Sequence, residues 1–437
     1  MHHLYSLRSL RRLDRQISPH QAVRRMFYHE LSLSSSSSRT DRTIPELLHY
    51  QSWSDQNSQP DLGESFVKVD VHAAPWNPAD ANFVQGTYAS PYDQRNHSGI
   101  TGLETALAQS KAVAEDIRQS KYRRDAIVVG SEGIGRVSHV PPHVGADVKL
   151  NVGDWVTFGL PGLGTMRSSL WLPSDALLPI RQGPKLLSSD DQQALHMATL
   201  FQLGGTALRM LKDFLPPSEL QQDGAVILQN AGNSGVGFML SQLTKILYPK
   251  SAMISLVRRG KRSEQDFTNL VNYLTTSGKN QLVIAEEDLA DKDFFREVQS
   301  KIHNEVSNKL PVIAFNSVGG SSSSHLLRLL GPGGVHVTYG GMSRQPVTVS
   351  TPQLIFRDVQ VRGYWHSRWC VQQFIRQTNA QQNMIDELVG YVLSGDLVCP
   401  PAQVFSLSQY KEAIEYDESQ FSAAIRKKIV FDCQAGT

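Results

Sequence analysis

A short apolar run and the glycine-rich turn after it constrain the fold more than any other stretch of this chain. The run is Ala225 to Leu228, and Asn230-Ala-Gly-Asn-Ser-Gly-Val-Gly237 follows it. Such a run is typical of a buried parallel strand, and apolar residues then recur at helical spacing from Val236 to Leu247. The start of a helix favours an anion through its free N–H groups and its dipole. The glycines do not follow the strict G-x-G-x-x-G spacing, so the turn alone fits a structural role as well as a phosphate site.

Strands and helices alternate after this turn. We expect strands at 253–257, 281–285, 311–316 and 334–339, and helices at 263–276, 291–306 and 321–330. This α/β alternation predicts a doubly wound parallel sheet, the Rossmann fold, in which ligands bind beyond the carboxyl ends of the strands. Those ends carry Asn230, Arg258, Asn316 to Gly320 and Tyr339 to Met342. Several polar and glycine-rich turns should therefore meet in one crevice, and their convergence favours a dinucleotide site.

The end of the second strand indicates which dinucleotide would bind. NAD sites usually place an acidic residue there, whereas the 2′-phosphate of NADP requires cations. This chain has Val257-Arg-Arg-Gly-Lys-Arg262, with no acid before Glu264. Arginine matches phosphate oxygens in a bidentate manner. The segment predicts NADPH as the cofactor, and a solvated basic loop is the alternative.

The residues before the turn predict a β-rich domain. Ser65 to His72 alternates apolar and polar side chains like a half-buried antiparallel strand, and a short helix should start at Pro78. Strands and glycine turns follow at 127–137, 152–158 and 162–167, which favours a partly closed β-domain. Helices at 192–200 and 206–214 lead into the glycine turn. The polar stretch Ala89–Ala126 is predicted to be a surface insertion, with a helix at 101–119 that has only a narrow apolar stripe.

The first 42 residues have the composition of an organellar transit peptide. They are rich in serine and poor in acids, they contain no lysine, and their arginines are interspersed with apolar residues: Arg8, Arg11, Arg12, Arg15, Arg24 and Arg25. This composition predicts mitochondrial import, and a disordered basic tail is the alternative. The folded part is then expected to begin near Thr43.

Composition excludes several other functions. A net charge of +2 gives no reason to expect a nucleic-acid partner, and no apolar run is long enough to span a membrane. The three cysteines lie too far apart for a C-x-x-C site. Glu132 in Gly130-Ser-Glu-Gly133 raises the question of a metal, but no histidine or cysteine stands beside it. Because zinc requires three or four such ligands, we predict no metal and a structural role for Glu132.

Several motifs in the same order resemble those of one family. They are Ala73-Ala-Pro-Trp-Asn-Pro-Ala-Asp80, Gln85-Gly-Thr-Tyr88, Gly162-Leu-Gly-Thr165, Asn230 to Gly237, Tyr339-Gly-Gly-Met342 with Gln345-Pro346, and Arg362-Gly-Tyr-Trp365 with Trp369. From about Glu64 to the C-terminus, apart from Ala89–Ala126, the chain resembles the mitochondrial trans-2-enoyl-thioester reductases. These belong to the zinc-independent medium-chain dehydrogenase/reductase superfamily.

The resemblance implies an architecture and an activity. A GroES-like catalytic domain would span 43–195, a Rossmann NADPH domain 196–364, and residues 365–437 would return to the catalytic domain. The implied reaction is NADPH-dependent reduction of enoyl-CoA or enoyl-acyl-carrier-protein thioesters in mitochondrial fatty acid synthesis. The implied location is the mitochondrial matrix, and the implied assembly is a homodimer. Tyr88 would donate the proton, since a phenol of ordinary pKa about 10 is protonated at working pH.

The same resemblance implies the cofactor contacts. They are Asn233, Ser234, Gly235 and Val236 at the pyrophosphate; Arg258, Arg259 and Gly260 at the 2′-phosphate; Tyr339, Gly340, Gly341, Met342, Tyr364, Trp365, His366 and Ser367 on the nicotinamide side; and Lys427 near the C-terminus. One departure is Leu203, which stands where the family carries a polar residue. A second is Arg259-Gly260, which replaces the acidic partner in the family's arginine loop and should favour NADPH further.

Two rival functions and one open segment remain. A zinc-independent quinone or alkenal reductase would share the fold, and a non-catalytic NADPH-binding protein would explain Leu203. The insertion at 89–126 is either a lid or carrier-protein surface, for which its five basic residues would suit phosphates or an acidic partner, or a passive loop. Those residues are Lys111, Arg118, Lys121, Arg123 and Arg124.

Overall fold

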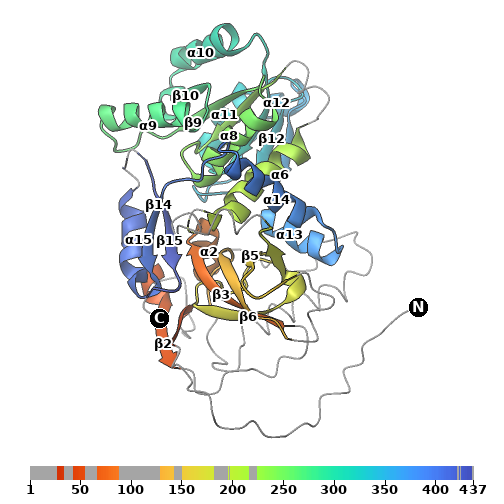
Figure 1. The fold of residues 1–437 in the computed structure, drawn as a ribbon. Helices are drawn as coiled ribbons and strands as arrows, with labels where there is room; N and C mark the ends of the chain where they lie inside the picture. The colour runs from red at the N-terminus through yellow and green to blue at the C-terminus, as the bar shows by residue number, and fades with distance from the viewer. Residues whose placement is uncertain are drawn as a thin grey trace, which may run out of the picture.

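Two β-sheets, one parallel and one antiparallel, organise the protein (Figure 1). The computed structural model describes residues 27–33, 43–54, 66–87, 128–141, 150–181, 195, 197–215, 224–420, 423 and 425–435. The predicted proton donor Tyr88 and the whole 89–126 insertion lie outside the described residues, as do residues 1–26 of the predicted transit peptide. None of the described helices is long and apolar enough to cross a membrane.

The parallel sheet confirms the predicted Rossmann fold. Its six strands follow the order β10-β9-β8-β11-β12-β13. They are β8 (Val226–Asn230), β9 (Ala252–Val257), β10 (Leu282–Ala285), β11 (Pro311–Asn316), β12 (Val335–Thr338) and β13 (Gln360–Gly363). The connecting helices are α8 (Gly235–Leu247), α9 (Glu264–Thr276), α10 (Lys292–Lys301) with a π-helical continuation (Ile302–Val306), and α11 (Gly320–Leu329). The strand order reverses beside β8, at the topological switch point where this fold binds ligands.

The second sheet, most of which lies in the lower half of Figure 1, is antiparallel except for one parallel pair at its edge. Its strands are β3 (Phe66–Pro75), β4 (Ile134–His139), β5 (Trp155–Phe158), β6 (Ser169–Pro173), β7 (Leu177–Pro179), β14 (Ala402–Ser406) and β15 (Lys428–Asp432). β15 pairs with β3, so the C-terminal segment returns to the sheet built by the N-terminal half. α15 (Tyr410–Ser419) packs on β14 and β15, which form the returning strand pair. The predicted helix at Pro78 is α2 (Pro78–Val84), which follows β3 directly.

The fold begins earlier than we predicted. β1 (Phe27–Leu33) pairs antiparallel with β2 (Leu48–Ser54), and a short helix, α1 (Ile44–Leu47), precedes β2. Leu31 is fully buried; its N–H donates to Met166 O at 2.9 Å and its C=O accepts from Val129 N at 3.0 Å. The arginine and serine content of the surrounding residues concealed an alternating Phe-Tyr-His-Glu-Leu-Ser-Leu segment that pairs as a strand. The expected boundary at Thr43 was therefore wrong.

A helical layer joins the two sheets. It contains a π-helical turn, η3 (Leu200–Gly204), the following α6 (Gly205–Phe214), α13 (His366–Ile375) and α14 (Ala380–Leu393). The expected helix at 192–200 was partly wrong, because its described end is a turn at Ala198 and Thr199 that leads into η3. One apolar cluster runs from Ile134 in the antiparallel sheet through Phe201 to Ile227 in the parallel sheet. The two sheets therefore share one apolar cluster in addition to clusters of their own.

Candidate active site

The glycine turn after β8 ends at a well-capped helix. The hydroxyl oxygen of Ser234 accepts from Gly237 N at 3.1 Å and so provides the N-cap of α8. Asn233, Ser234, Gly235 and Val236 are all half-buried at this helix start. Free N–H groups and the positive end of the helix dipole meet there, as an anion site requires. All four residues predicted for the pyrophosphate thus lie together.

Close backbone packing explains the glycines of this turn. A Cβ added at Gly237 would lie 2.6 Å from Ala231 O, and one added at Gly235 would lie 2.6 Å from Leu203 Cδ1. Both separations are too short for real side chains. Leu203 is buried and belongs to the shared core, so the departure from the family's polar residue places an apolar side chain directly against the turn.

A network of buried polar side chains supports the glycine turn. Near the end of β8, Gln229 Nε2 lies within hydrogen-bond distance of three oxygens: Gly237 O at 3.1 Å and the Ser241 and Ser255 hydroxyls at 2.7 Å each. Ser255 in turn donates to Asn280 Oδ1. Buried polar groups that are hydrogen-bonded in this way fix the backbone, whereas an unpaired one would cost free energy. The turn is therefore preorganised.

The strand ends converge as predicted. Asn230 Nδ2 donates to Asn316 Oδ1 at 2.7 Å, and Asn230 Oδ1 accepts from Ser317 N at 2.8 Å. The loop after β12 joins them, because Met342 N donates to Ser317 O at 3.0 Å. The carboxyl ends of β8, β11 and β12 are thus tied into one edge by their own side chains and loops.

The loop after β12 contains the second predicted group, Tyr339 to Met342. The Tyr339 hydroxyl is buried, and burial raises its pKa to about 12, while the neighbouring hydroxyls of Ser317 and Ser234 favour the ionised form. Tyr339 therefore lies beside the start of α8. Gly340 packs on Ser317, and Met342 is half-exposed.

This loop also contacts the antiparallel half of the molecule. Arg344 Nη2 donates to Gln85 Oε1 at 2.9 Å. Gln85 closes α2 and starts the Gln-Gly-Thr-Tyr motif that ends at Tyr88. Sequence reasoning missed this contact, because a single arginine in a polar loop gives no signal of its partner. The contact brings the predicted proton-donor motif to the edge where the strand ends converge.

The arginine loop after β9 differs from its prediction. We expected no acid beside Arg258 and Arg259, but the connection after β10 supplies several. Glu287 accepts through its two carboxylate oxygens from Arg259 N at 2.9 Å and Gly260 N at 3.0 Å. The Arg259 side chain pairs with Asp288 at 3.1 Å and Glu264 at 3.5 Å, and it lies over the Phe267 ring. Arg259 thus holds the loop together, and the expectation of an acid-free loop was wrong.

Arg258 has a different environment from Arg259. Its side chain is exposed, whereas Arg262 turns back to bond the carbonyl oxygens of Arg258 at 3.0 Å and Ala423 at 2.8 Å. Burial lowers the pKa of Arg262, and the positive charge of Arg258 adds to this effect. Of the two arginines predicted for a 2′-phosphate, only Arg258 keeps its guanidinium exposed.

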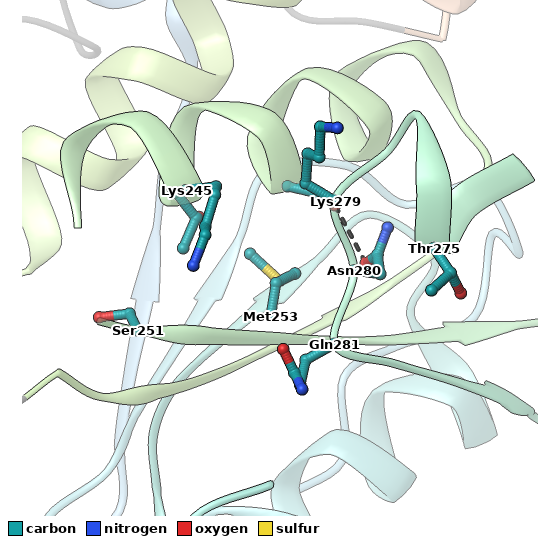
Figure 2. A pocket seen from close by; sticks show the side chains of 9 residues that line it. Lys245, Ser251, Met253, Thr275, Lys279, Asn280 and Gln281 are labelled. Atoms are coloured by element: carbon teal, nitrogen blue, oxygen red, sulfur yellow. Dashed lines mark hydrogen bonds between the residues drawn. The ribbon is translucent and has the colours of Figure 1, made fainter. Parts of the chain in front are cut away.

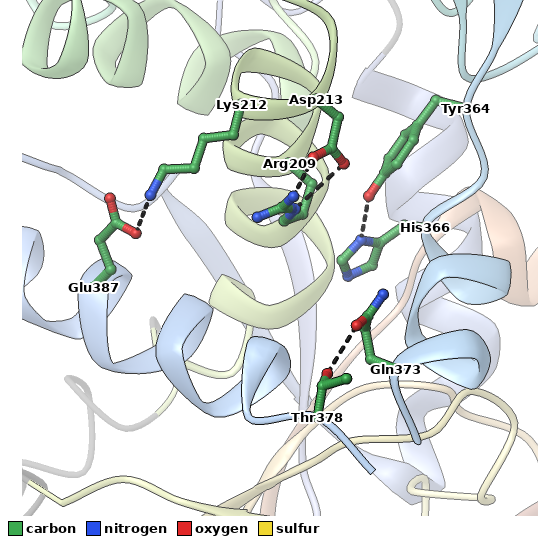
Figure 3. Close-up of polar contacts among 8 residues, drawn as sticks. All are labelled: Arg209, Lys212, Asp213, Tyr364, His366, Gln373, Thr378 and Glu387. Carbon is green, nitrogen blue, oxygen red and sulfur yellow. Dashed lines mark hydrogen bonds and ion pairs between the residues drawn. The ribbon is translucent and has the colours of Figure 1, made fainter. Parts of the chain in front are cut away.

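Residues 364–367 were predicted to line the nicotinamide, but two of them have buried side chains. The Tyr364 hydroxyl and His366 Nδ1 are 2.9 Å apart, and both side chains are buried within the helical layer (Figure 3). His366 packs against Phe201 and Trp369, and burial lowers its pKa to about 3. Tyr364 and His366 fill the core beside α6, and their role on the nicotinamide side stays a prediction. Trp365 and Ser367 are half-buried.

Lys427 lies at the start of β15. Its side chain is exposed, and Nζ donates to Gln403 Oε1 at 3.4 Å. This contact keeps it on the returning strand pair, and its role toward a cofactor stays a prediction.

A separate hollow of about 280 Å³ lies at the opposite end of the parallel sheet. Ser251, Met253 and Gln281 at the amino ends of β9 and β10 line it, together with Lys245 of α8 (Figure 2). Ligands of this fold bind at the carboxyl ends, so the hollow is not the dinucleotide site. Among the described residues, no cluster of three or more His, Cys, Asp or Glu side chains could hold a metal ion.

A family model described as zinc-binding dehydrogenase matches residues 298–422. The mitochondrial enoyl-acyl-carrier-protein reductase of Mus musculus is 34% identical over 360 residues, which cover 82% of this chain and 79% of that protein. The Homo sapiens protein of the same name is 33% identical over the same shares of the two chains.

Solved structures share the fold. The complex of Etr1p with NADP and crotonyl-CoA is 22% identical, with a TM-score of 0.71 and coverage of 93% of this chain and 100% of that one. A putative NADPH:quinone reductase from Bacillus thuringiensis is 19% identical, with a TM-score of 0.64 and coverage of 93% and 99%. Both likenesses show that the two-sheet architecture is shared.

Proposed function

The chain belongs to the family of the mitochondrial enoyl-acyl-carrier-protein reductases, and from this premise we propose that it reduces the α,β double bond of trans-2-enoyl thioesters with NADPH. It is therefore an oxidoreductase of fatty acid synthesis. The thioester is carried either by CoA or by an acyl carrier protein. The relatives are named as mitochondrial, and we assign the matrix to this chain as well.

The observation that carries the proposal is the hydrogen bond between Arg344 and Gln85. It places the start of the Gln-Gly-Thr-Tyr motif at the edge where the glycine turn and the loop after β12 meet. Tyr88 follows Gln85 by three residues, a reach of at most about 11 Å along the chain. A proton donor on this motif and a cofactor at the strand ends would share one reaction space.

The residues of the strand ends fit NADPH. The capped start of α8, free of side chains at Gly235 and Gly237, would hold the pyrophosphate. The exposed Arg258 guanidinium would bind the 2′-phosphate, and Tyr339 would form the wall beside the start of α8. NADPH, when bound, supplies the hydride that adds to the β-carbon.

Tyr88 completes the reaction as a general acid. Negative charge develops on the thioester oxygen and the α-carbon, and the phenol proton goes to that carbon. Water then returns a proton to the phenolate. A phenol suits this task because its ordinary pKa of about 10 keeps it protonated at neutral pH.

We propose that the protein forms a homodimer, and the exposed edge of the parallel sheet supports this assembly. All four residues of the edge strand β13 are exposed, including the apolar Val361. Leu354, Ile355 and Phe356 of the neighbouring α12 (Thr351–Ile355) and its end are exposed too, Phe356 at 79%. A bare edge strand beside an apolar patch is usually covered by a partner, and a two-fold pairing of β13 with a second copy would cover both.

Phe356→Asp should give a monomer in light scattering; a dimer in this variant would reject the interface.

Isotope labelling tests the reaction and its proton donor. With NADPH deuterated on the transferred position, crotonyl-CoA should yield butyryl-CoA labelled at the β-carbon; in heavy water with ordinary NADPH, the label should appear at the α-carbon. Tyr88→Phe should lower kcat by about 100-fold or more, the scale of general acid catalysis, while NADPH still binds. A variant with full turnover would remove Tyr88 from the mechanism.

A further inference from the structure

A buried carboxylate joins the two halves of the molecule at this site. Glu132 is fully buried and lies two residues before β4 in the chain. Its Oε2 accepts from Asn77 Nδ2 at 2.9 Å, and its Oε1 accepts from Gln202 N at 2.6 Å. Asn77 belongs to the antiparallel half, whereas Gln202 lies in η3, which packs on α8 of the parallel half. One carboxylate therefore bonds both sides of the domain junction.

Each of the two partners leads directly to one of the segments that meet at the carboxyl edge of the parallel sheet. Asn77 is the N-cap of α2, whose other end is the Gln85 turn before Tyr88. Gln202 precedes Leu203, the side chain that packs against Gly235 in the glycine turn. The bonds of Glu132 thus connect the segment of the proton donor to the segment that supports the start of α8.

The surroundings of Glu132 keep it in place. Thr165 Oγ1 donates to the Glu132 carbonyl at 2.6 Å. Asp80 of α2 repels the carboxylate, Lys428 of β15 attracts it, and the Cys399 thiol lies close enough for its own pKa to be raised by this acid. Asp417 of α15 and Arg426 act in turn on Lys428. Burial raises the pKa of Glu132 and lowers that of Lys428, and the two donors at Glu132 counter this effect on the acid.

Stability alone gives a poor reason for such an arrangement. A buried ion cluster often contributes no more than well-packed apolar residues of the same volume would. A carboxylate does supply two acceptor oxygens in one rigid plane, and here each oxygen meets an N–H from a different element. The specific contribution of this carboxylate is that it fixes the distance between α2 and η3.

We propose that Glu132 is a positioning residue, which aligns the end of α2 at Gln85 with the dinucleotide turn by bonding Asn77 and Gln202 together. The inference rests on the proposed function, because it assigns to those turns the proton donor and the cofactor. Displacement of a reacting group by about 1 Å can cost about 100-fold in rate. Loss of the bridge should therefore slow the chemical step more than it weakens NADPH binding.

Glu132→Gln breaks the bridge without changing its size. The glutamine oxygen can still accept from Gln202 N, but its amide group would then meet the donor Nδ2 of Asn77. We expect kcat to fall about tenfold while the Kd for NADPH changes by less than about twofold. Amide hydrogen exchange at Gln202 and over 78–87 should accelerate, which is a readout independent of turnover.

A second variant exchanges the two partners. Glu132→Gln with Asn77→Asp places the donor on residue 132 and the acceptor on residue 77, and leaves the net charge unchanged. This pair should recover kcat to within about threefold of the native enzyme, and the amide protection with it. Glu387→Gln is the control: it removes a carboxylate that bonds Lys212 of α6, away from the bridge, and should keep native kcat.

Three results would overturn the inference: native kcat in folded Glu132→Gln, unchanged amide exchange, or no recovery in the exchanged pair. If Glu132→Gln alone does not fold, the exchanged pair compared with Asn77→Asp alone carries the same test. A native protein that does not oxidise NADPH with an enoyl thioester would reject the proposed function instead, while hydrogen exchange would still report on the bridge.

Discussion

Two turns at the same edge of the parallel sheet do different work by different means. The turn after β8 is sealed by apolar and backbone contacts, with Leu203 packed on Gly235 and Gly237 close to Ala231 O. The turn after β9 is exposed and charged, and Glu287 holds its backbone N–H groups. Under the proposed function, the first turn would accept the pyrophosphate that all dinucleotides share, and the second would present the charge that distinguishes the 2′-phosphate of NADPH from the hydroxyl of NADH.

The contrast between the two turns predicts which substitutions weaken the binding of every cofactor and which change the choice between NADPH and NADH. Close packing gives a site little freedom to change, because an added methyl group has no space. The charged side chains of the exposed loop, whose backbone is held by Glu287, can be substituted without disturbing the core. Substitutions in the first turn should therefore affect folding and every cofactor, and those in the second should affect the choice between NADPH and NADH.

The largest effect is expected at Leu203. Leu203→Ala leaves a cavity beside the glycine turn and should lower the free energy of unfolding by about 2–5 kcal/mol, as buried leucines do. Urea denaturation at constant pH measures this. Arg258→Ala, in the exposed turn, should change it by less than about 0.5 kcal/mol. Equal losses in both variants would erase the contrast between the turns.

Gly237→Val should weaken binding of both cofactors. Overpacking typically costs about 1–3 kcal/mol, and the branched side chain would push Ala231 away from the start of α8, so Kd should rise by about 10- to 100-fold for NADPH and NADH alike. Fluorescence titration of the reduced cofactors measures both constants. Gly390→Ala is the matched control, since nothing lies within 4 Å of an added Cβ there. Unchanged affinity in Gly237→Val would show that the turn does not hold the pyrophosphate.

Arg258→Ala should affect selectivity instead. A charge-assisted hydrogen bond in an exposed site contributes enough that KM for NADPH should rise about tenfold, while KM for NADH should barely change. Arg259→Ala should raise both KM values by a similar, smaller factor, because Arg259 pairs with Asp288 and Glu264. Both constants come from initial rates at saturating thioester. The reverse ranking of the two arginines would assign the phosphate to Arg259.

The smallest effect is expected at Glu287. Glu287→Gln keeps one acceptor for the Arg259 and Gly260 N–H groups and removes the charge that assists them, so KM should rise by less than about threefold for either cofactor. Faster tryptic cleavage after Arg258 or Arg259 should accompany this, because the loop opens more often. Cleavage rates equal to those of the native protein would show that the charge of Glu287 does not help to order the loop.

Sequence reasoning succeeded where local pattern and geometry coincide. The strand ends of the parallel sheet follow from alternation alone, so Asn230 and Asn316 meet as expected. It failed where the partner comes from elsewhere in the chain. Asp288 reaches Arg259 only because β10 lies beside β9, and nothing near the arginine announces it.

Side-chain direction is the other property that the sequence pattern does not predict. Tyr364 and His366 follow a strand at the correct edge, yet their rings pack into the helical layer beside Phe201 and Phe214. Position along a strand predicts which edge a residue occupies, whereas packing of a sequence-distant helix decides which way its side chain lies. The paired strand Phe27–Leu33 was missed because the arginines and serines around it have the composition of a transit peptide.

The central claim is that this chain reduces enoyl thioesters with NADPH. The most direct test is the rate of NADPH oxidation by one preparation with crotonyl-CoA, a trans-2-decenoyl thioester and a quinone, each varied to saturation. We expect kcat/KM for the thioesters to be at least about 100-fold above that for the quinone, the discrimination expected when site groups pair specifically with one substrate. A quinone rate equal to or above the thioester rates would identify a quinone reductase, and no NADPH oxidation with any substrate would identify a binding protein.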